Sequence, residues 1–216
     1  MKKNIVLFTL FILPLVAYLF FASGVNSFAK LPTLTKAIPD INMWQSDTQK
    51  PVFLKDKISI VGFTGSATHK GNFFNLYEKI YNRNQTFKDF QIVMIVPDGM
   101  QSKIEELKTD LRKLGDISGW HFVFASPKEI NEFYSKMKLV GNLDASLGSN
   151  NVYIVDKKLN LRGRKGKSVK GDVEYKEGYD TNLVSELHNE MTDDVKVILA
   201  EYRLALKKNH NASRKI

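Results

Sequence analysis

The chain has 216 residues, a formal net charge of +9 and no cysteine. Because cysteine is absent, the chain cannot form disulfides or carry out dithiol redox chemistry or thiolate catalysis, and it cannot bind a metal through cysteine. Its length suits one domain after an N-terminal segment, and its positive charge favours anionic neighbours without specifying a fold.

An apolar segment opens the chain. Lys2 and Lys3 precede an almost unbroken apolar run from Ile5 to Ala22. Eighteen helical residues span about 27 Å, close to the hydrocarbon thickness of a bilayer. We therefore predict a transmembrane anchor in residues 1–24, with the lysines in the cytoplasm and the domain outside it. The small residues near Ser27 leave a cleavable signal peptide as an alternative.

The next segments predict a tether followed by a βαβ unit. Residues 25–50 contain prolines and small polar residues, which indicate a tether and an extended lead-in. The domain is predicted to cover residues 51–208. Two short runs rich in β-branched residues, Ile58–Phe63 and Phe90–Val96, predict buried strands, and apolar residues at helical spacing between them predict a helix over 71–83.

The alternation then continues. Apolar spacing predicts a helix over Gln101–Leu114, and Trp120–Ala125 follows as a strand. Ser126, Pro127 and Glu129 form the pattern of an N-cap, a first-turn proline and a capping box. A third helix is therefore predicted to begin there.

The last part of the chain predicts a hairpin and a terminal helix. Asn151–Asp156 is an apolar strand, and Leu159–Arg164 is its predicted hairpin partner. A helical stripe begins at Leu183 and restarts after a predicted cap at Thr192. The tail, residues 209–216, is polar and basic.

This order predicts an α/β fold with a mixed central sheet flanked by helices and preceded by the N-terminal transmembrane helix. Several α/β folds satisfy the alternation. A late hairpin followed by a terminal helix favours the thioredoxin fold, because doubly wound nucleotide-binding folds would continue with parallel crossovers.

Three segments resemble one family within that fold. Phe63-Thr64 ends the first core strand, Val96-Pro97-Asp98 ends the next, and Asn151–Asp156 ends in aspartate. These segments are similar to the SCO/SenC proteins, which are membrane-anchored thioredoxin-fold domains that supply copper to cytochrome oxidase. The resemblance covers roughly residues 36–206.

The resemblance also implies that the family's copper ligands are missing. Its Cys-Pro-x-x-Cys loop places the first cysteine at Ser66, the proline at Ala67 and the second cysteine at Lys70. Its copper-binding histidine falls on Gly148. Soft Cu(I) prefers thiolate or thioether ligands, which neither a hydroxyl nor an ammonium group provides. We therefore predict no cofactor, no metal site and no enzymatic activity.

The loop around Ser66 leaves several other interpretations open. Backbone amides before the following helix, with Ser66, His69 and Lys70, could bind an anion or a partner. A copper chaperone could use His69 with a methionine, and a cysteine-independent enzyme could use Ser66, His69 and Lys70. The simplest interpretation is a polar turn that the fold requires.

A basic segment follows the predicted strand over Asn151–Asp156. Residues 157–170 contain seven lysines and arginines and no acid. Within it Arg162, Arg164, Lys165 and Lys167 are candidates for binding an anionic lipid surface or an acidic partner. The segment has no aromatic residues for stacking bases, which argues against nucleic acid.

These observations predict a membrane-anchored, non-catalytic protein similar to SCO/SenC proteins, located on the periplasmic or extracytoplasmic side. The resemblance implies a binding or assembly role with an envelope or membrane protein, such as a respiratory oxidase during its biogenesis.

Overall fold

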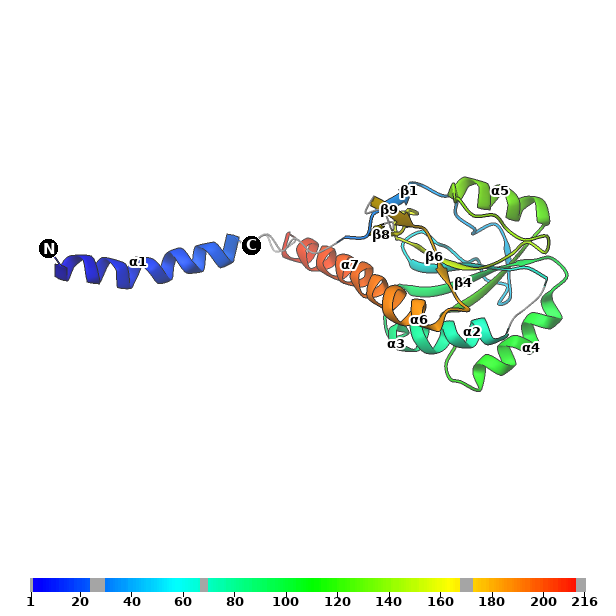
Figure 1. The fold of residues 1–216 in the computed structure, drawn as a ribbon. Helices are drawn as coiled ribbons and strands as arrows, with labels where there is room; N and C mark the ends of the chain where they lie inside the picture. Colours follow the sequence, from blue (N-terminus) through cyan, green and yellow to red (C-terminus); the bar gives the residue numbers. More distant parts are fainter. Residues whose placement is uncertain (1, 24–29, 67–69, 168–172, 213–216) are drawn as a thin grey trace.

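The computed structural model describes residues 2–23, 30–66, 70–167 and 173–212. Figure 1 shows a helix, α1, followed by an α/β domain. The strands are β1 (Thr33–Thr35), β2 (Gln45–Ser46), β3 (Ile58–Thr64), β4 (Phe90–Pro97), β5 (Trp120–Ala125), β6 (Gly148–Val155), β7 (Leu161–Arg162), β8 (Arg164–Lys167), β9 (Val173–Lys176) and β10 (Tyr179–Asp180). The α-helices are α1 (Lys2–Ser23), α2 (Lys70–Leu76), α3 (Asn82–Asn84), α4 (Gln101–Arg112), α5 (Pro127–Met137), α6 (Val184–Glu186) and α7 (Thr192–Ala212).

The central sheet is mixed, as predicted. In the described residues its order is β1-β7-β6-β3-β4-β5-β2, and β10 also pairs with β6. β3, β4 and β5 are parallel, whereas β6 runs antiparallel to β3. The β-branched runs Ile58–Val61 and Ile92–Val96 are buried throughout, because helices and loops cover both faces of the sheet.

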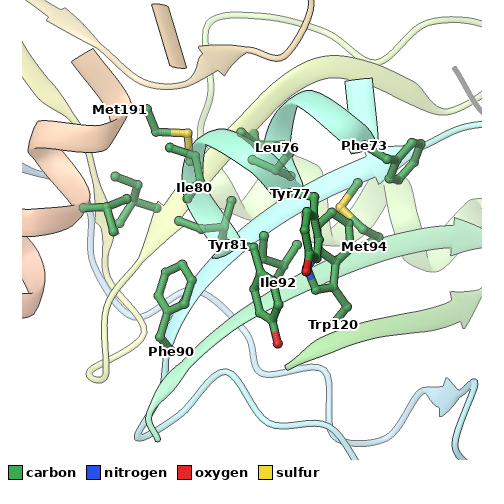
Figure 2. Close-up of a cluster of buried hydrophobic side chains, with 14 of the residues drawn as sticks. Phe73, Leu76, Tyr77, Ile80, Tyr81, Phe90, Ile92, Met94, Trp120 and Met191 are labelled. Carbon is green, nitrogen blue, oxygen red and sulfur yellow. The ribbon is translucent and has the colours of Figure 1, made fainter. Parts of the chain in front are cut away.

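Two hydrophobic clusters fill the space on either side of the sheet. One includes Tyr77, Met94 and Trp120, which Figure 2 labels, together with buried residues of α2, α4 and α7. The other includes Phe63 and Tyr153 and lies beneath α5. The predicted apolar stripes of these helices therefore face the sheet.

The predicted start of α5 is confirmed. The Ser126 hydroxyl accepts a hydrogen bond from the Glu129 backbone N–H, and the Glu129 carboxylate accepts one from the Ser126 N–H at 2.9 Å. Pro127 occupies the first helical position, where its missing N–H costs nothing.

Two helical stretches each contain a π-helical segment. These segments, η1 (Tyr77–Tyr81) and η2 (Leu187–Met191), pack against each other. The predicted cap at Thr192 was wrong, because the helix continues through this residue. Its hydroxyl donates backwards to the Leu187 carbonyl at 2.8 Å instead of capping a new helix.

The lead-in predicted for residues 25–50 contributes to the domain. β1 pairs with β7, and β2 pairs with β5. Leu31, Ile38 and Ile41 are buried in the core. Packed structure therefore begins near Leu31, ahead of the predicted start at residue 51.

The predicted hairpin is confirmed, but the chain continues differently after it. β6 and β7 are antiparallel, with Val155 opposite Leu161. β8 then pairs with β9 in a separate two-stranded sheet, and β10 returns to β6. Strands β9 and β10 were not predicted, because they are only four and two residues long and have no apolar run.

Helix α1 contains the predicted apolar run. Phe8, Leu10 and Phe11 are among its exposed side chains. Within the described residues, no helix is long and apolar enough to cross a membrane, so the predicted span is not confirmed.

Candidate functional site at the ends of β3 and β6

Ser66 and Gly148, two of the three positions of the lost family ligands, lie near the place where β3 ends and β6 begins. Thr64 pairs with Gly148 in the antiparallel ladder between these strands. The chain then turns at Gly65, which has a left-handed backbone with φ of 61°. The loop that starts with exposed Ser66 therefore leaves the sheet next to Gly148.

Gly65 and Gly148 pack backbone to backbone. A Cβ atom at Gly65 would lie 2.4 Å from Ser146 Oγ and 2.9 Å from Gly148 Cα. A Cβ atom at Gly148 would lie 3.1 Å from Asp144 Oδ2 and 3.2 Å from Gly65 Cα. A side chain at the place where the family resemblance puts a histidine would therefore press on the Asp144 carboxylate and on the Gly65 backbone.

A turn at Asp144 holds this contact in place. One carboxylate oxygen, Oδ1, accepts hydrogen bonds from the Ser146 N–H at 2.7 Å, the Ser146 hydroxyl at 2.7 Å and the Gly148 N–H at 2.8 Å. Leu147 has a φ of 66°, which completes the tight turn. The carboxylate thus satisfies backbone donors at the start of β6.

Lys70 points away from this site, toward α4. Its ammonium group lies 2.6 Å from Asp110 Oδ2, and Lys113 binds the other oxygen of Asp110 at 2.7 Å. The hydrogen bonds from Lys113 and Lys70 lower the pKa of Asp110 to about 2, and the hydrogen bond to Asp110 raises the pKa of Lys70. The proposed use of Lys70 in an anion cradle or catalytic group is therefore not supported.

Of the remaining loop residues named above, the structure describes Ser66. The Ser66 carbonyl accepts a 3.4 Å hydrogen bond from Lys103. Ala67 and His69 lie outside the described residues. In the described part of the chain, no group of three or more His, Asp or Glu side chains could hold a metal ion.

A cavity of about 160 Å³ lies between the strand ends and α2. Its apolar side includes Phe73 from α2 and Met94 from β4, both labelled in Figure 2. Its polar side includes Asn72, Asn150 and Thr181. The amide of Asn72 donates to the Asn150 side-chain oxygen at 3.4 Å, and Thr181 donates to the Asn150 carbonyl through both its N–H and its hydroxyl.

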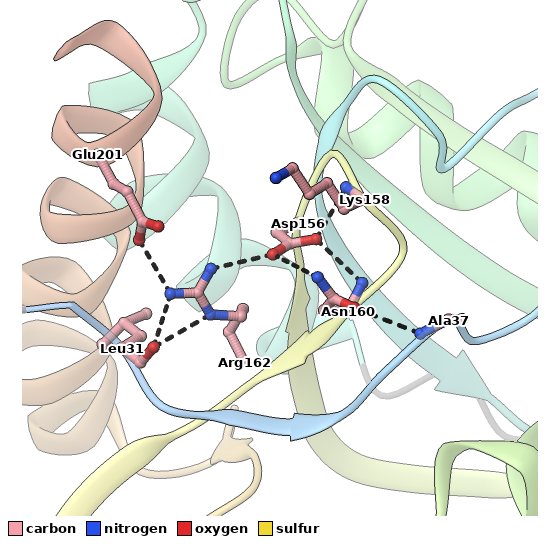
Figure 3. Close-up of polar contacts among 7 residues, drawn as sticks. All are labelled: Leu31, Ala37, Asp156, Lys158, Asn160, Arg162 and Glu201. Atoms are coloured by element: carbon pink, nitrogen blue, oxygen red, sulfur yellow. Dashed lines mark hydrogen bonds and ion pairs between the residues drawn. The ribbon is translucent and has the colours of Figure 1, made fainter. Parts of the chain in front are cut away.

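Two arginines of the basic segment are structural and not free to bind a partner, in contrast to their prediction as binding candidates. Arg162 is buried, and its guanidinium lies 2.9 Å from Asp156, 2.9 Å from Glu201 and 2.6 Å from the Leu31 carbonyl (Figure 3). Burial alone would lower its pKa, but the hydrogen bonds to Asp156 and Glu201 raise it. Arg162 therefore joins β7, α7 and the N-terminal segment, and it cannot face an external anion.

Arg164 is paired as well. Its guanidinium lies 3.0 Å from Asp194, which also accepts a 2.6 Å hydrogen bond from the Tyr179 hydroxyl. Lys165 is exposed on β8. Lys167 ends the same strand, and its side chain lies outside the described residues. Two of the four predicted basic candidates are thus already neutralised by acids distant in sequence.

Solved structures of other proteins share this fold, whereas sequence comparisons give no match. No protein-family model and no curated protein matches the sequence. The structure does match that of a SCO1/SenC family lipoprotein from Bacillus anthracis str. Ames, with a TM-score of 0.54, 17% identity and coverage of 79% of this chain and 99% of the other. The domain has the thioredoxin-like fold seen in SCO/SenC structures.

A second structure agrees. BsSco, described as a member of the Sco family of cytochrome c oxidase assembly proteins, matches with a TM-score of 0.55 and 15% identity, over 78% of this chain and 95% of its own. The predicted thioredoxin-like architecture is therefore confirmed. The SCO/SenC fold is present in a chain without any cysteine.

Sequence reasoning missed the cavity residues. Asn72, Asn150 and Thr181 come from α2, β6 and the turn after β10, and no spacing in the sequence links them. The turn at Asp144 had a local signal, because an aspartate two residues before a serine and four before a glycine is typical of a side-chain-capped turn.

Proposed function

We propose that this protein is a non-catalytic binding protein of the cell envelope, built on the SCO/SenC fold without its dithiol or copper chemistry. One observation carries this proposal. Gly148, at the position of the family histidine, packs against Gly65, and Ser66 and Lys70 occupy the two cysteine positions. Three soft or nitrogen ligands are replaced by groups that do not bind Cu(I).

The binding surface that we propose is the cavity at the ends of β3 and β6. Asn72, Asn150 and Thr181 provide amide and hydroxyl groups beside the apolar Phe73 and Met94. Such a mixture of an apolar wall and a few polar groups is typical of sites that bind a ligand group. By analogy with BsSco, we propose a protein partner in the assembly of a respiratory oxidase.

We also propose that α1 attaches the domain to the membrane, with the domain on the extracytoplasmic side. The sequence supports this proposal, because two lysines precede an apolar run from Ile5 to Ala22. Transfer of exposed apolar side chains of α1, such as Phe8 and Leu10, from water into lipid would lower the free energy.

Copper titration tests the loss of the metal site. The purified full chain, in detergent, is titrated with Cu(I) against a chromophoric chelator. We expect no stoichiometric uptake by the natural protein, and uptake by the S66C/K70C variant as a positive control. Stoichiometric uptake by the natural protein that is lost in His69→Ala or Met94→Leu would refute the proposal in favour of a chaperone with other ligands.

Site-specific crosslinking tests the partner. A photoreactive residue replaces Ser149, which lines the cavity, or Lys128, which is exposed on α5. In native membranes we expect the Ser149 position to capture a subunit or assembly factor of a respiratory oxidase and the Lys128 position to capture none. Equal capture from both positions, or no capture of an envelope protein, would refute the proposed surface.

A further inference from the structure

The opposite end of the sheet contains a second cavity, of about 460 Å³. It lies where β3 begins at Ile58, beside the loop that precedes β4 and the outer part of α7. The candidate site lies at the other end of β3, after Thr64. The two cavities therefore occupy opposite ends of the domain.

Basic groups outnumber acids in the lining of this second cavity. Lys88, Lys157 and Arg203 line it together with one acid, Asp89. Asp89 is already paired with Lys157 and lies 3.7 Å from the Lys57 ammonium group. In the part of the chain that the structure describes, Lys88 and Arg203 form no ion pair with an acid. The cavity therefore keeps an excess of positive charge.

The floor of the cavity is apolar and aromatic. Ile58 and Leu199 are buried there, and Phe87 is partly exposed at its edge. The ammonium group of Lys157 lies 5.7 Å from the centre of the Tyr202 ring. Cations beside an apolar floor suit a ligand that joins a phosphate to an apolar body.

The chain from α1 enters the domain beside this cavity. Arg162 links the Leu31 carbonyl to Glu201 (Figure 3). The next residue, Tyr202, lines the cavity. Leu31 is eight residues from Ser23, the end of α1, and eight extended residues span at most about 28 Å. If α1 is attached to a membrane, as proposed above, the cavity is held near the lipid headgroups.

We propose that this cavity binds the phosphate headgroup of an anionic phospholipid. Lys88 and Arg203 would contact the phosphate, and Phe87 and Tyr202 would lie against the glycerol and the adjoining acyl carbons. Bound lipid would orient the domain with the candidate site facing away from the membrane. The step that rests on the proposed function is the nearness of the membrane, whereas the cavity and its charges are independent of it.

Thermal unfolding of the full chain in dodecylmaltoside micelles tests this proposal. Phosphatidylglycerol or phosphatidylcholine is added at equal mole fraction, and soluble glycerol 3-phosphate is added in a third arm. We expect phosphatidylglycerol alone to raise the unfolding midpoint, by about 5 to 10 °C at a concentration 100 times the dissociation constant. The rise should shrink as salt increases.

Paired variants identify the site. K88Q/R203Q should lose most of the rise, whereas K128Q/K136Q, which removes the same charge from exposed positions on α5, should keep it. An equal rise with phosphatidylcholine, or an unchanged rise in K88Q/R203Q, would overturn the proposal. A full rise with glycerol 3-phosphate would assign the cavity to free phosphate compounds and overturn the lipid assignment. Flotation with neutral vesicles tests attachment by α1 separately, because it does not depend on this cavity.

Discussion

Gly65 and Gly148 lie so close that the Cα atom of Gly148 is 2.9 Å from the position of a Cβ atom at Gly65. This contact joins the end of β3 to the start of β6, the place where related structures are expected to carry their metal ligands. A side chain at Gly65 would clash with the Ser146 hydroxyl and the Gly148 backbone, so the turn packs tightly only with glycine there. The domain thus has the thioredoxin-like fold of SCO/SenC structures, with a crowded backbone at Gly148 and with Ser66 and Lys70 exposed.

Substitution of Gly65 by alanine should destabilise the domain. The new Cβ would meet Ser146 Oγ at 2.4 Å, and the positive φ of Gly65 disfavours a side chain. We expect the free energy of unfolding to fall by about 1 to 3 kcal/mol in urea titrations. Gly71→Ala is the control, because its Cβ would meet nothing within 4 Å. An equal loss in both variants would contradict this explanation.

Restoring the family residues in two steps should show separately what the two cysteines do for copper binding and what the histidine does to stability. S66C/K70C should bind Cu(I), because two thiolates suit this ion. Adding Gly148→His should lower the unfolding free energy by about 1 to 3 kcal/mol, since its Cβ would press on Asp144 and on the Gly65 backbone. Competition titration and urea unfolding measure the two effects. Tighter copper binding without any loss of stability in the triple variant would show that the turn opens freely.

Removal of the Arg162 side chain should be among the most damaging changes in the domain. Arg162→Ala would leave Asp156, whose side chain is only 2% exposed, without its buried partner. We expect a loss of about 3 to 5 kcal/mol in unfolding free energy. Lys158→Ala, at an exposed position in the same basic segment, should change stability by less than about 0.5 kcal/mol. Similar losses in both variants would argue against a structural role specific to Arg162.

His121 should make stability depend on pH. Burial lowers its pKa below the ordinary 6.5, and its Nδ1 has no hydrogen-bond partner among the described residues. As the pH falls below 6.5, His121 is protonated in the unfolded chain at a higher pH than in the folded domain. The free energy of unfolding therefore declines there, by at most about 1.4 kcal/mol per pH unit. His121→Gln should reduce this decline in urea unfolding measured from pH 8 to pH 5. Above pH 7 the two proteins should show parallel profiles, and an unchanged slope below pH 6.5 would refute the assignment.

Local patterns in the sequence were sufficient for the order of the main elements. The β-branched runs at Ile58 and Ile92 predict strands, and Ser126 with Glu129 predicts the start of α5, because each signal depends on residues a few positions apart. The same reasoning failed at Thr192 and missed β9 and β10. In these places contacts with other elements, such as the pairing of β10 with β6, determine the local structure.

The absence of cysteine, and with it the absence of dithiol chemistry, follows from the sequence alone. Tertiary structure determines the role of the arginines in the basic segment. Arg162 pairs with Glu201, 39 residues away in the sequence, and Arg164 pairs with Asp194, 30 residues away. The closed contact of Gly65 with Gly148, and the cavities at both ends of the sheet, likewise depend on the pairing of distant strands. Charge and composition are local properties, whereas ion pairing and cavity shape arise only when distant segments are packed together.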